Sequence, residues 1–484
     1  MFKPTMKEMS ELARDYKIIP LCCEIFADIK TPLEVLRILK GIDKHCFLLE
    51  SVEDLKNWGR YSFLGFDPKI ELTCTNGVLK INDKTIQTNE PQKYIKKLLD
   101  DYKAPKIKGF PPFCGGLVGY FSYDFIKYFE PELNLNAKDE EGFCDVDLML
   151  FDKIIAFDNL RQKIILIVNI QTDNLEENYK KGQEELKKIV DLIKYGKVCE
   201  VEPLILKSEF KPLFDEEKFC DMIKRAKKYI IDGDIFQVVL SNRFEADCGG
   251  DLLSTYRYLR TISPSPYMFY FDSCNLQIAG ASPETLVKLE NGKLSTFPLA
   301  GTRRRGKTKE EDLALEAELL ADEKELAEHN MLVDLGRNDI GKISEFNSVE
   351  VEKYMSIERF SHVMHIGSTV CGKIKKEFGA IDAIGAILPA GTLCGAPKIR
   401  ACEIINELED NKRGIYGGAI GYIDFSGNLD TAIAIRIAYK KNNKVFVRVG
   451  AGVVYDSIEK LEYKETINKS RAIMEALKLS KVQP

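Results

Sequence analysis

The sequence has no run of about 20 consecutive apolar residues, the length that a membrane-spanning helix needs. Its first residues, MFKPTMKEMSELARDY, are charged and lack the apolar stretch of an export signal. Neither a membrane protein nor a secreted protein is indicated. We therefore expect a cytoplasmic protein that does not contact membranes.

Histidine is scarce and the cysteines are scattered. The chain has only 4 histidines, and its 13 cysteines include no CxxC pair. These spacings disfavour a zinc site and predict reduced thiols rather than a disulfide framework. The 70 basic and 75 acidic residues give a formal charge of −5, which offers no electrostatic reason to expect a nucleic-acid partner.

The order of the predicted elements indicates the fold class. Short strand-like runs and helical patterns follow one another without regular βαβ alternation, which favours an α+β fold with antiparallel sheets. The segment 198–214 carries two prolines between two helical patterns and is the best linker candidate. We expect an N-terminal region of residues 1–205 and a second region of residues 215–480.

Capping signals locate several helices. Thr31 followed by Pro32 predicts a helix start, and Gly41 predicts its end. Further helices are predicted at 173–195, 215–232 and, as one long helix, 310–332. Strands are predicted at IFQVVLSNRFEA and LDTAIAIRIAYK.

Residues 301–308, GTRRRGKT, satisfy the P-loop pattern GxxxxGK[ST] between a strand and a helix. Three arginines, however, fill positions where small residues normally let backbone amides surround phosphates. Pro298 also interrupts the preceding strand. A solvated basic turn is the favoured interpretation, and nucleotide binding is the alternative.

Two helical segments carry acidic pairs with the same spacing. Glu325 and Glu328 share one helix face, as do Glu462 and Glu465. Most such pairs are solvated faces. If both helices instead point into one cavity, four carboxylates would surround a hard cation, and oxygen-only ligation suits Mg²⁺.

Arg436 and the glycines after residue 449 are candidate anion-binding groups. In a continuous strand, Arg436 would share a face with alanines, which leaves room for a planar anion. A salt bridge to Asp430 or Asp424 is the equally weighted alternative. The backbone amides of residues 450–452 could bind a carboxylate, although glycines there more often allow tight packing.

Taken together, long motifs across the chain resemble the large subunit of anthranilate synthase, in the chorismate-utilising enzyme family. They are GDIFQVVLS, SPSPYMFY, GASPE, PLAGTRRRG, ELLADEKELAEHNMLVDLGRNDIGK, HVMHI, LPAGTLCGAPKIRACEIINELE, RGIYGGAIGYIDFSGNLDTAIAIR and GAGVVYDS. The resemblance implies two entwined antiparallel β-sheets, a β-sandwich-like core, with helices packed outside and the active site between the sheets. It also implies a chorismate-binding catalytic role for the second region.

The resemblance also implies roles for individual residues. Chorismate carries two carboxylates that must be neutralised, and its leaving hydroxyl needs a proton. The residues matched to catalysis are Glu284 as general acid, His365 for the elimination step, and Thr392. Those matched to substrate binding are Tyr416, Arg436, Gly450, Ala451, Gly452 and Lys469. Those matched to a Mg²⁺ cofactor are Glu325, Glu328, Glu462 and Glu465.

Ala300 separates two branches of the resemblance. Aminodeoxychorismate synthases typically carry lysine there, so alanine favours anthranilate as the product, with aminodeoxychorismate synthase component I as the alternative. The chain has no glutaminase-like Gly-x-Cys-x-Gly elbow, so a separate glutamine amidotransferase subunit is expected to supply ammonia.

A feedback site for tryptophan is implied near the start of the chain. Its matched residues are Glu50, Ser51, Pro266, Tyr267 and Met268, so the N-terminal region would carry part of a regulatory site. A non-catalytic tryptophan-binding regulator is the alternative from another class. It is disfavoured because the matched acid, histidine and four carboxylates are all present.

Overall fold

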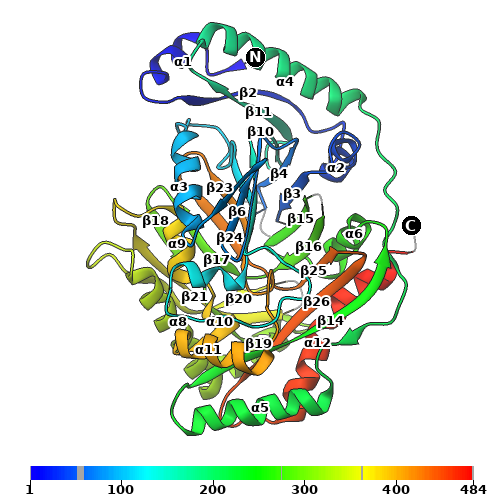
Figure 1. Cartoon of the computed structure of the whole chain (residues 1–484), viewed down its shortest axis with the longest axis vertical. Helices are drawn as coiled ribbons and strands as arrows, with labels where there is room; N and C mark the ends of the chain where they lie inside the picture. Colours follow the sequence, from blue (N-terminus) through cyan, green and yellow to red (C-terminus); the bar gives the residue numbers. More distant parts are fainter. Residues whose placement is uncertain (1, 52–58, 274, 361–362, 482–484) are drawn as a thin grey trace.

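The computed structural model describes residues 2–51, 59–273, 275–360 and 363–481. Over these residues the chain forms two large antiparallel β-sheets with helices on their outer faces (Figure 1). The predicted α+β class is confirmed.

The first sheet has 14 strands in the described part of the chain, and its two ends come from distant parts of the sequence. Its main order is β1 (Phe2–Lys3), β2 (Ile18–Phe26), β11 (Lys163–Gln171), β10 (Lys153–Asp158), β4 (Tyr61–Phe66), β3 (Cys46–Glu50), β15 (Tyr267–Ser273), β16 (Leu276–Ser282), β25 (Ile437–Lys441), β26 (Lys444–Val453), β14 (Gln237–Gly249) and β12 (Ile205–Leu206). The short strands β13 (Lys211–Pro212) and β22 (Gly395–Ala396) also pair with β14. The predicted linker therefore contributes two short strands to this sheet.

The second sheet has 12 strands among the described residues. Its main order is β19 (Leu299–Arg304), β21 (Val363–Lys373), β18 (Lys293–Thr296), β17 (Thr285–Glu290), β24 (Leu429–Ile433), β23 (Ala419–Asp424), β8 (Gly116–Phe121), β9 (Val146–Phe151), β5 (Ile70–Thr75), β6 (Val78–Ile81) and β7 (Lys84–Gln87). β20 (Glu350–Arg359) pairs with β21. Both sheets thus combine strands from before residue 172 and after residue 236, which is the predicted entwined arrangement.

The described helices are α1 (Met6–Leu12), α2 (Pro32–Lys40), α3 (Pro91–Asp101), the 3₁₀-helix η1 (Tyr123–Tyr128), α4 (Leu175–Tyr195), α5 (Glu216–Ile231), α6 (Leu253–Ile262), α7 (Lys309–Ala321), α8 (Glu323–Gly341), α9 (Ala380–Ile387), α10 (Gly391–Cys394), α11 (Lys398–Glu409) and α12 (Glu459–Leu479). The capping box at Thr31 and the end of α2 at Gly41 confirm that part of the prediction.

Three apolar clusters hold these layers together. Aromatic and aliphatic side chains of both sheets, including Phe47, Phe151 and Phe446, fill the space between them. A second cluster joins the first sheet to α2, α4, α6 and α12. A third joins the second sheet to α8 and α9. One of these clusters thus joins the two sheets to each other, and the other two join each sheet to helices that cover it.

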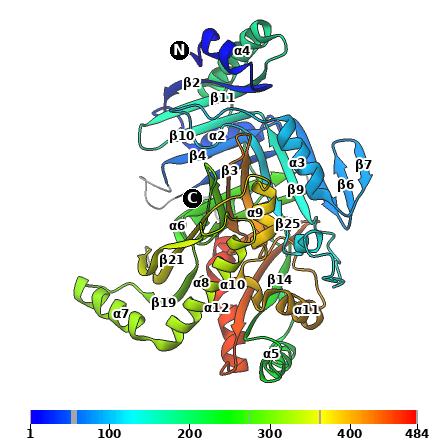
Figure 2. The ribbon, with the colours of Figure 1, turned by 90° about the vertical axis from the view of Figure 1, so that its left-hand side faces the viewer.

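The predicted helix 310–332 is wrong in one respect, because the structure divides it into α7 and α8. Asp322 separates them with an extended backbone, ψ 100°. Its carboxylate accepts hydrogen bonds from the amides of Lys324 and Glu325, so it caps α8. α7 projects away from the body of the molecule while α8 packs on β21 (Figure 2).

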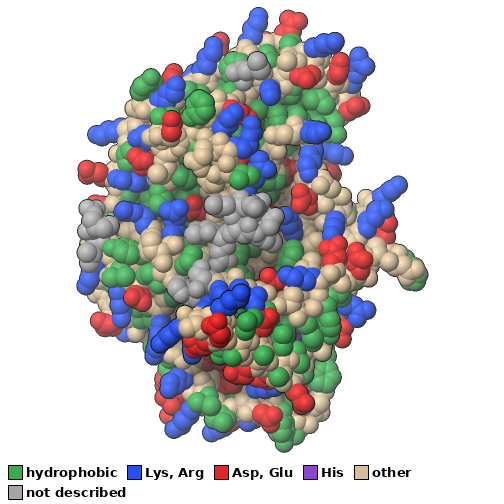
Figure 3. Space-filling view, turned by 180° about the vertical axis from the view of Figure 1, so that it is seen from behind, with side chains coloured by type: hydrophobic (Ala, Val, Ile, Leu, Met, Phe, Trp, Pro, Cys, Tyr) green, Lys and Arg blue, Asp and Glu red, His purple; other side chains and the backbone are tan. Residues whose placement is uncertain are grey.

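The surface charge agrees with the small net charge of the sequence. On the face opposite to that of Figure 1, basic and acidic side chains are intermixed rather than separated into fields of one sign (Figure 3). In the part of the chain that the structure describes, no helix is long and apolar enough to cross a bilayer.

Candidate active site

A cavity of about 480 Å³ lies where β14 and β26 of one sheet face the α8 and α12 helices. All but one of the residues matched to catalysis, substrate and metal line it: Glu284, His365, Thr392, Tyr416, Arg436, Gly450, Gly452, Lys469, Glu325, Glu328, Glu462 and Glu465. Ala451 is the exception, because alternation along β26 turns its buried side chain to the other face. The sites predicted from distant segments therefore meet in one place.

Glu284 lies at the turn between β16 and β17 and is aimed at Thr392 and Arg436. The Thr392 hydroxyl donates to Glu284 Oε1 at 3.1 Å. Burial raises the pKa of Glu284 to about 7, against the lowering effects of Thr392 and the Arg436 guanidinium. A carboxyl with this pKa can hold and release a proton near neutrality.

Arg436 does not belong to a continuous strand, and this part of the prediction is wrong. β24 ends at Ile433 and β25 begins at Ile437, and Arg436 has φ 50°. The left-handed backbone turns its side chain into the cavity, where burial lowers its pKa and Glu284 is its opposing charge. A left-handed backbone is uncommon in residues other than glycine, asparagine and aspartate, and strained conformations of this kind cluster at active sites.

His365 of β21 is held in a defined tautomer. Its Nδ1 lies 2.8 Å from the carbonyl oxygen of Gly301, which can only accept, so Nδ1 carries the hydrogen. Burial lowers the pKa of His365, and Gly301 and Arg436 modify it less. The ring is therefore neutral at pH 7 with Nε2 available as a base.

The four carboxylates come from two helices that face the cavity together. Burial raises the pKa of Glu328, and the charge of Glu325 adds to this effect. Burial also raises the pKa of Glu462, and Glu465 contributes again. This mutual repulsion is what a divalent cation would relieve, and the donors are all oxygens, as Mg²⁺ prefers.

Within the described residues, however, no three of these groups approach closely enough to form a preassembled cluster. Two carboxylates instead have cationic neighbours. Glu325 lies 3.6 Å from Arg303, and Glu465 lies 2.6 Å from Lys469. The site has carboxylate oxygens that suit Mg²⁺, and the ion pairs with Arg303 and Lys469 would have to break or lengthen when the ion binds.

Glycine at two positions of β26 leaves room for neighbouring polar side chains. A Cβ on Gly450 would lie 2.8 Å from the Tyr416 hydroxyl oxygen, and one on Gly452 would lie 2.9 Å from Gln237 Nε2. Lys469 Nζ donates to the carbonyl of Gly450 at 3.1 Å. The glycines therefore let polar side chains approach the strand.

Gln237 was missed by the sequence reasoning. Its buried side chain lines the cavity and hydrogen-bonds Glu328. The available signal was alternation, because Gln237 and Val239 share the strand face that lines the cavity.

A second cavity, of about 130 Å³, contains all five residues matched to tryptophan: Glu50, Ser51, Pro266, Tyr267 and Met268. They meet because β3 and β15 are neighbouring strands, with Glu50 opposite Met268. Glu50 accepts from the Tyr256 hydroxyl at 2.6 Å and forms an ion pair with Arg260. The cavity thus joins two segments more than 200 residues apart.

The P-loop pattern at 301–308 has no open anion site. The backbone amide of Gly306 donates to Asp312, and that of Lys307 donates to Glu311. Arg305 pairs with Asp312 at 2.7 Å. The amides of Gly306 and Lys307 are bound to the chain's own carboxylates, which disfavours nucleotide binding. The favoured interpretation is also corrected, because residues 301–304 belong to strand β19 and the arginines form ion pairs instead of a solvated turn.

Comparison with known proteins identifies the family to which the chain belongs. The model of the chorismate binding enzyme family matches residues 44–475. The chain belongs to this family of chorismate-binding enzymes.

Within that family, several full-length relatives above 40% identity carry the same name. Anthranilate synthase component 1 from Acetivibrio thermocellus is 44% identical, covering 99% of both chains, and that from Aquifex aeolicus is 43% identical, covering 98% of both. The solved anthranilate synthase component I from Streptococcus pneumoniae TIGR4 is 40% identical with a TM-score of 0.78, covering 93% of this chain and 98% of that one. The menaquinone-specific isochorismate synthase from Escherichia coli, at 16% identity and a TM-score of 0.71 over 98% of each chain, shares the fold. The resemblance stated from the motifs is confirmed.

Proposed function

We propose that this chain is the large subunit of a cytoplasmic anthranilate synthase. It would aminate chorismate with ammonia at the ring carbon next to the carboxylate-bearing carbon, and then eliminate pyruvate to give anthranilate, the first step of tryptophan biosynthesis. The observation that carries the proposal is the meeting of Glu284, His365, Arg436 and the four glutamates in one cavity. Relatives named anthranilate synthase component 1 at 42–45% identity support it.

The residues of the cavity account for substrate binding and proton transfer. Arg436 and the Tyr416 hydroxyl would hold the enolpyruvyl carboxylate, and the amides of β26 with Lys469 would hold the ring end. Glu284, protonated below about pH 7, would give its proton to the departing hydroxyl. Neutral His365 would then remove the ring proton during the elimination. At neutral pH the acid can still carry its proton and the histidine is uncharged.

The glutamates of α8 and α12 would hold Mg²⁺. When bound, the ion supplies positive charge that offsets the ring carboxylate and withdraws electrons from the ring. The role of the chain is to orient four carboxylates toward the cavity from two helices.

The test is the product formed by the purified chain. Incubation with chorismate, Mg²⁺ and an ammonium salt is expected to give anthranilate, identified by fluorescence, mass and comparison with a standard. Recovery of the 4-amino isomer would replace the proposal with aminodeoxychorismate synthase component I. Zero turnover beside intact tryptophan binding would favour the non-catalytic regulator.

We propose that a glutamine amidotransferase subunit is the partner of this chain. The naming of the relatives as component 1 supports a partner subunit, and the sequence carries no glutaminase elbow of its own. With glutamine as the only nitrogen source, the purified chain is expected to be inactive. Restoration of turnover by ammonium salts supports the proposal, and turnover with glutamine alone would contradict it.

Tryptophan inhibition is proposed through the smaller cavity. Tyr267 lines this cavity and contacts a neighbour of the candidate acid. Its hydroxyl lies 2.9 Å from the hydroxyl of Thr285, the residue after Glu284, and donates to Asp430 at 2.8 Å. Binding that moves Tyr267 would therefore change the surroundings of the acid.

Ser51→Phe is expected to retain turnover and to raise the tryptophan concentration for half inhibition at least about tenfold, because a phenyl group would occupy part of the cavity. Inhibition curves of wild type and variant provide the measurement. Ser10→Phe, on exposed α1, is the matched control. An unchanged curve for Ser51→Phe would remove this cavity from the regulatory assignment.

A further inference from the structure

A buried network of charges adjoins the candidate active site, and one of its members, Arg448, lines the cavity. Glu409, the last residue of α11, pairs with the guanidinium groups of Arg413 and Arg448 at 2.5 and 2.7 Å. The backbone amide of Ser241 also donates to Glu409 at 2.7 Å, and its hydroxyl accepts from Arg448 Nε at 2.8 Å. All four side chains are at most 2% exposed, so solvent screens these interactions little.

Arg413 uses its remaining donors on the cavity wall. Nη1 donates to the carbonyl of Leu393 at 2.6 Å, and Nη2 donates to that of Val239 at 2.6 Å. Both Leu393 and Val239 line the cavity, and Leu393 follows Thr392, which donates to Glu284. One guanidinium therefore connects α10 with β14, next to the residue that hydrogen-bonds the candidate acid.

The same guanidinium also supports a substrate-binding side chain. Its central carbon lies 5.9 Å from the centre of the Tyr416 ring, within the range of a cation–π contact. It also lies 4.7 Å from the centre of the Tyr123 ring. Tyr416 in turn places its hydroxyl beside Gly450.

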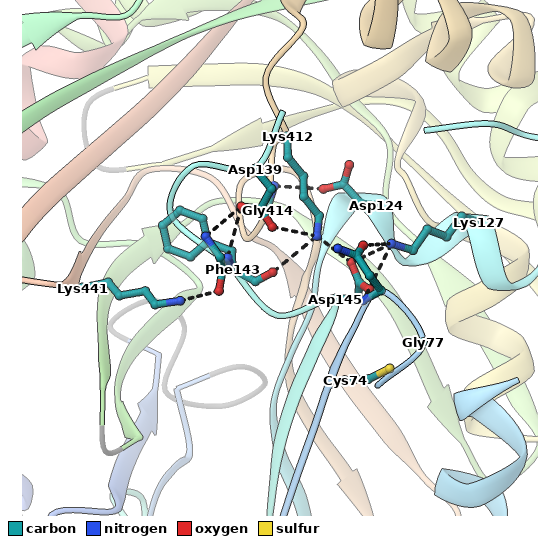
Figure 4. A network of polar contacts seen from close by, with 12 residues as sticks. Cys74, Gly77, Asp124, Lys127, Asp139, Phe143, Asp145, Lys412, Gly414 and Lys441 are labelled. Atoms are coloured by element: carbon teal, nitrogen blue, oxygen red, sulfur yellow. Dashed lines mark hydrogen bonds and ion pairs between the residues drawn. The ribbon is translucent and has the colours of Figure 1, made fainter. Parts of the chain in front are cut away.

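The chain segment that carries Arg413 is fixed from its other side as well. Lys412 pairs with Asp145 at 2.9 Å and with Asp139 at 3.3 Å, and the amide of Gly414 donates to Asp124 at 3.0 Å (Figure 4). Burial disfavours the charged form of Asp145, but the ammonium groups beside it keep its pKa lowered. Neighbouring residues are thus held by two separate ionic networks.

We propose that Arg413, held by Glu409, is a positioning residue for the active site. It sets the location of the Thr392–Leu393 turn and the Tyr416 ring, and through Thr392 it orients Glu284. This role rests on the proposed function of Glu284 as the acid. A buried ion network is costly and stabilises a fold no better than apolar packing, so its contacts to the cavity wall give a reason for its presence.

The substitution Arg413→Lys keeps the positive charge at this position but removes the planar guanidinium group. Lysine can keep an ion pair with Glu409, but its single ammonium cannot span the two carbonyls and the two tyrosine rings as the planar guanidinium does. We expect kcat for chorismate consumption to fall about tenfold or more, because small displacements of catalytic groups have large effects on rate. The Mg²⁺ concentration for half activity should stay within about twofold of wild type, since α8 and α12 carry no contact to Arg413 among the described hydrogen bonds and ion pairs.

Arg225→Lys provides the matched control. Arg225 pairs with Glu407, also on α11, but these side chains are about half exposed and lie on the outer surface. An exposed pair of this kind contributes little, so both kcat and thermal stability should remain near wild type.

A double-mutant cycle with Thr392→Ala tests whether Arg413 acts through the turn. If it does, Arg413→Lys should lower kcat less than about threefold in the Thr392→Ala background, against about tenfold in the wild-type background. Equal losses in both backgrounds would overturn the positioning role, as would unchanged kcat in folded Arg413→Lys. A general loosening of the fold would not produce this coupling.

Ser241→Ala repeats the cycle if Arg413→Lys does not fold. It removes only one hydroxyl from the network, and a loss of about threefold in kcat is expected, again reduced in the Thr392→Ala background. Chorismate consumption is the readout throughout. If the chain consumes chorismate but forms another product, the proposed function is wrong, yet the effect of Arg413 on kcat can still be measured. Failure of the proposed function and failure of the positioning role are therefore distinguishable.

Discussion

Glu284→Gln is expected to lower kcat by about 10²–10⁴-fold, the usual contribution of a general acid. Glutamine preserves the size of the side chain and can still accept from the Thr392 hydroxyl, but it has no proton to give. Steady-state rates with chorismate, Mg²⁺ and ammonium provide the measurement. A loss of less than about threefold would exclude Glu284 as the acid.

The pH dependence gives a second test of the same residue. Glu284 has a pKa of about 7 because burial disfavours its ionised form. As the acid, it must be protonated, so kcat should fall as pH rises through about 7 when free ammonia is held constant. This alkaline limb should be missing from the residual activity of Glu284→Gln. Glu377→Gln, an exposed carboxyl outside both cavities, should keep the wild-type rate and limb.

Removing one metal-facing carboxylate is expected to have the second largest effect. Glu325→Gln and Glu462→Gln, one from each helix, should each raise the Mg²⁺ concentration for half activity by at least about tenfold. A neutral amide is a weaker ligand for a hard cation than a carboxylate. Activity titrations against Mg²⁺, after removal of trace metal with a chelator, give the result.

Glu323→Gln is the matched control for this titration, because Glu323 lies on α8 two residues before Glu325 and is exposed. Its Mg²⁺ dependence should equal that of wild type. If Glu325→Gln and Glu462→Gln also retain the wild-type Mg²⁺ dependence, the ion does not lie between α8 and α12.

Local features of the fold could be predicted from the sequence because their causes are local. The Thr31-Pro32 cap and Gly41 bound α2, and the pattern over 215–232 gives α5. The break at Asp322 was missed because helix-favouring residues continue on both sides, and only the capping bonds to Lys324 and Glu325 decide it. The turn at Arg436 was missed for a similar reason: its neighbours are strand formers, and the left-handed backbone is imposed by the contacts of two different sheets.

The membership of the site could be predicted, but its geometry could not. Motifs identified the glutamates of α8 and α12, which lie more than 130 residues apart in the sequence. Nothing in the sequence itself brings the two helices together, and the sheets do so. The same holds for Glu50 and Met268, which become neighbours only when β3 pairs with β15. The sequence does not indicate that Glu409 and Arg413 form a buried network. It shows only two opposite charges four residues apart at the end of a helix, a spacing typical of exposed pairs.

The most direct test of the account is to locate a divalent ion in crystals of the chain. Crystals grown with Mn²⁺ in place of Mg²⁺ and soaked with chorismate would show the ion by its anomalous scattering. We predict one strong peak between α8 and α12, within about 2.5 Å of carboxylate oxygens from both helices, with the ring carboxylate of the ligand beside it. A peak elsewhere, or chorismate bound outside this cavity, would contradict it.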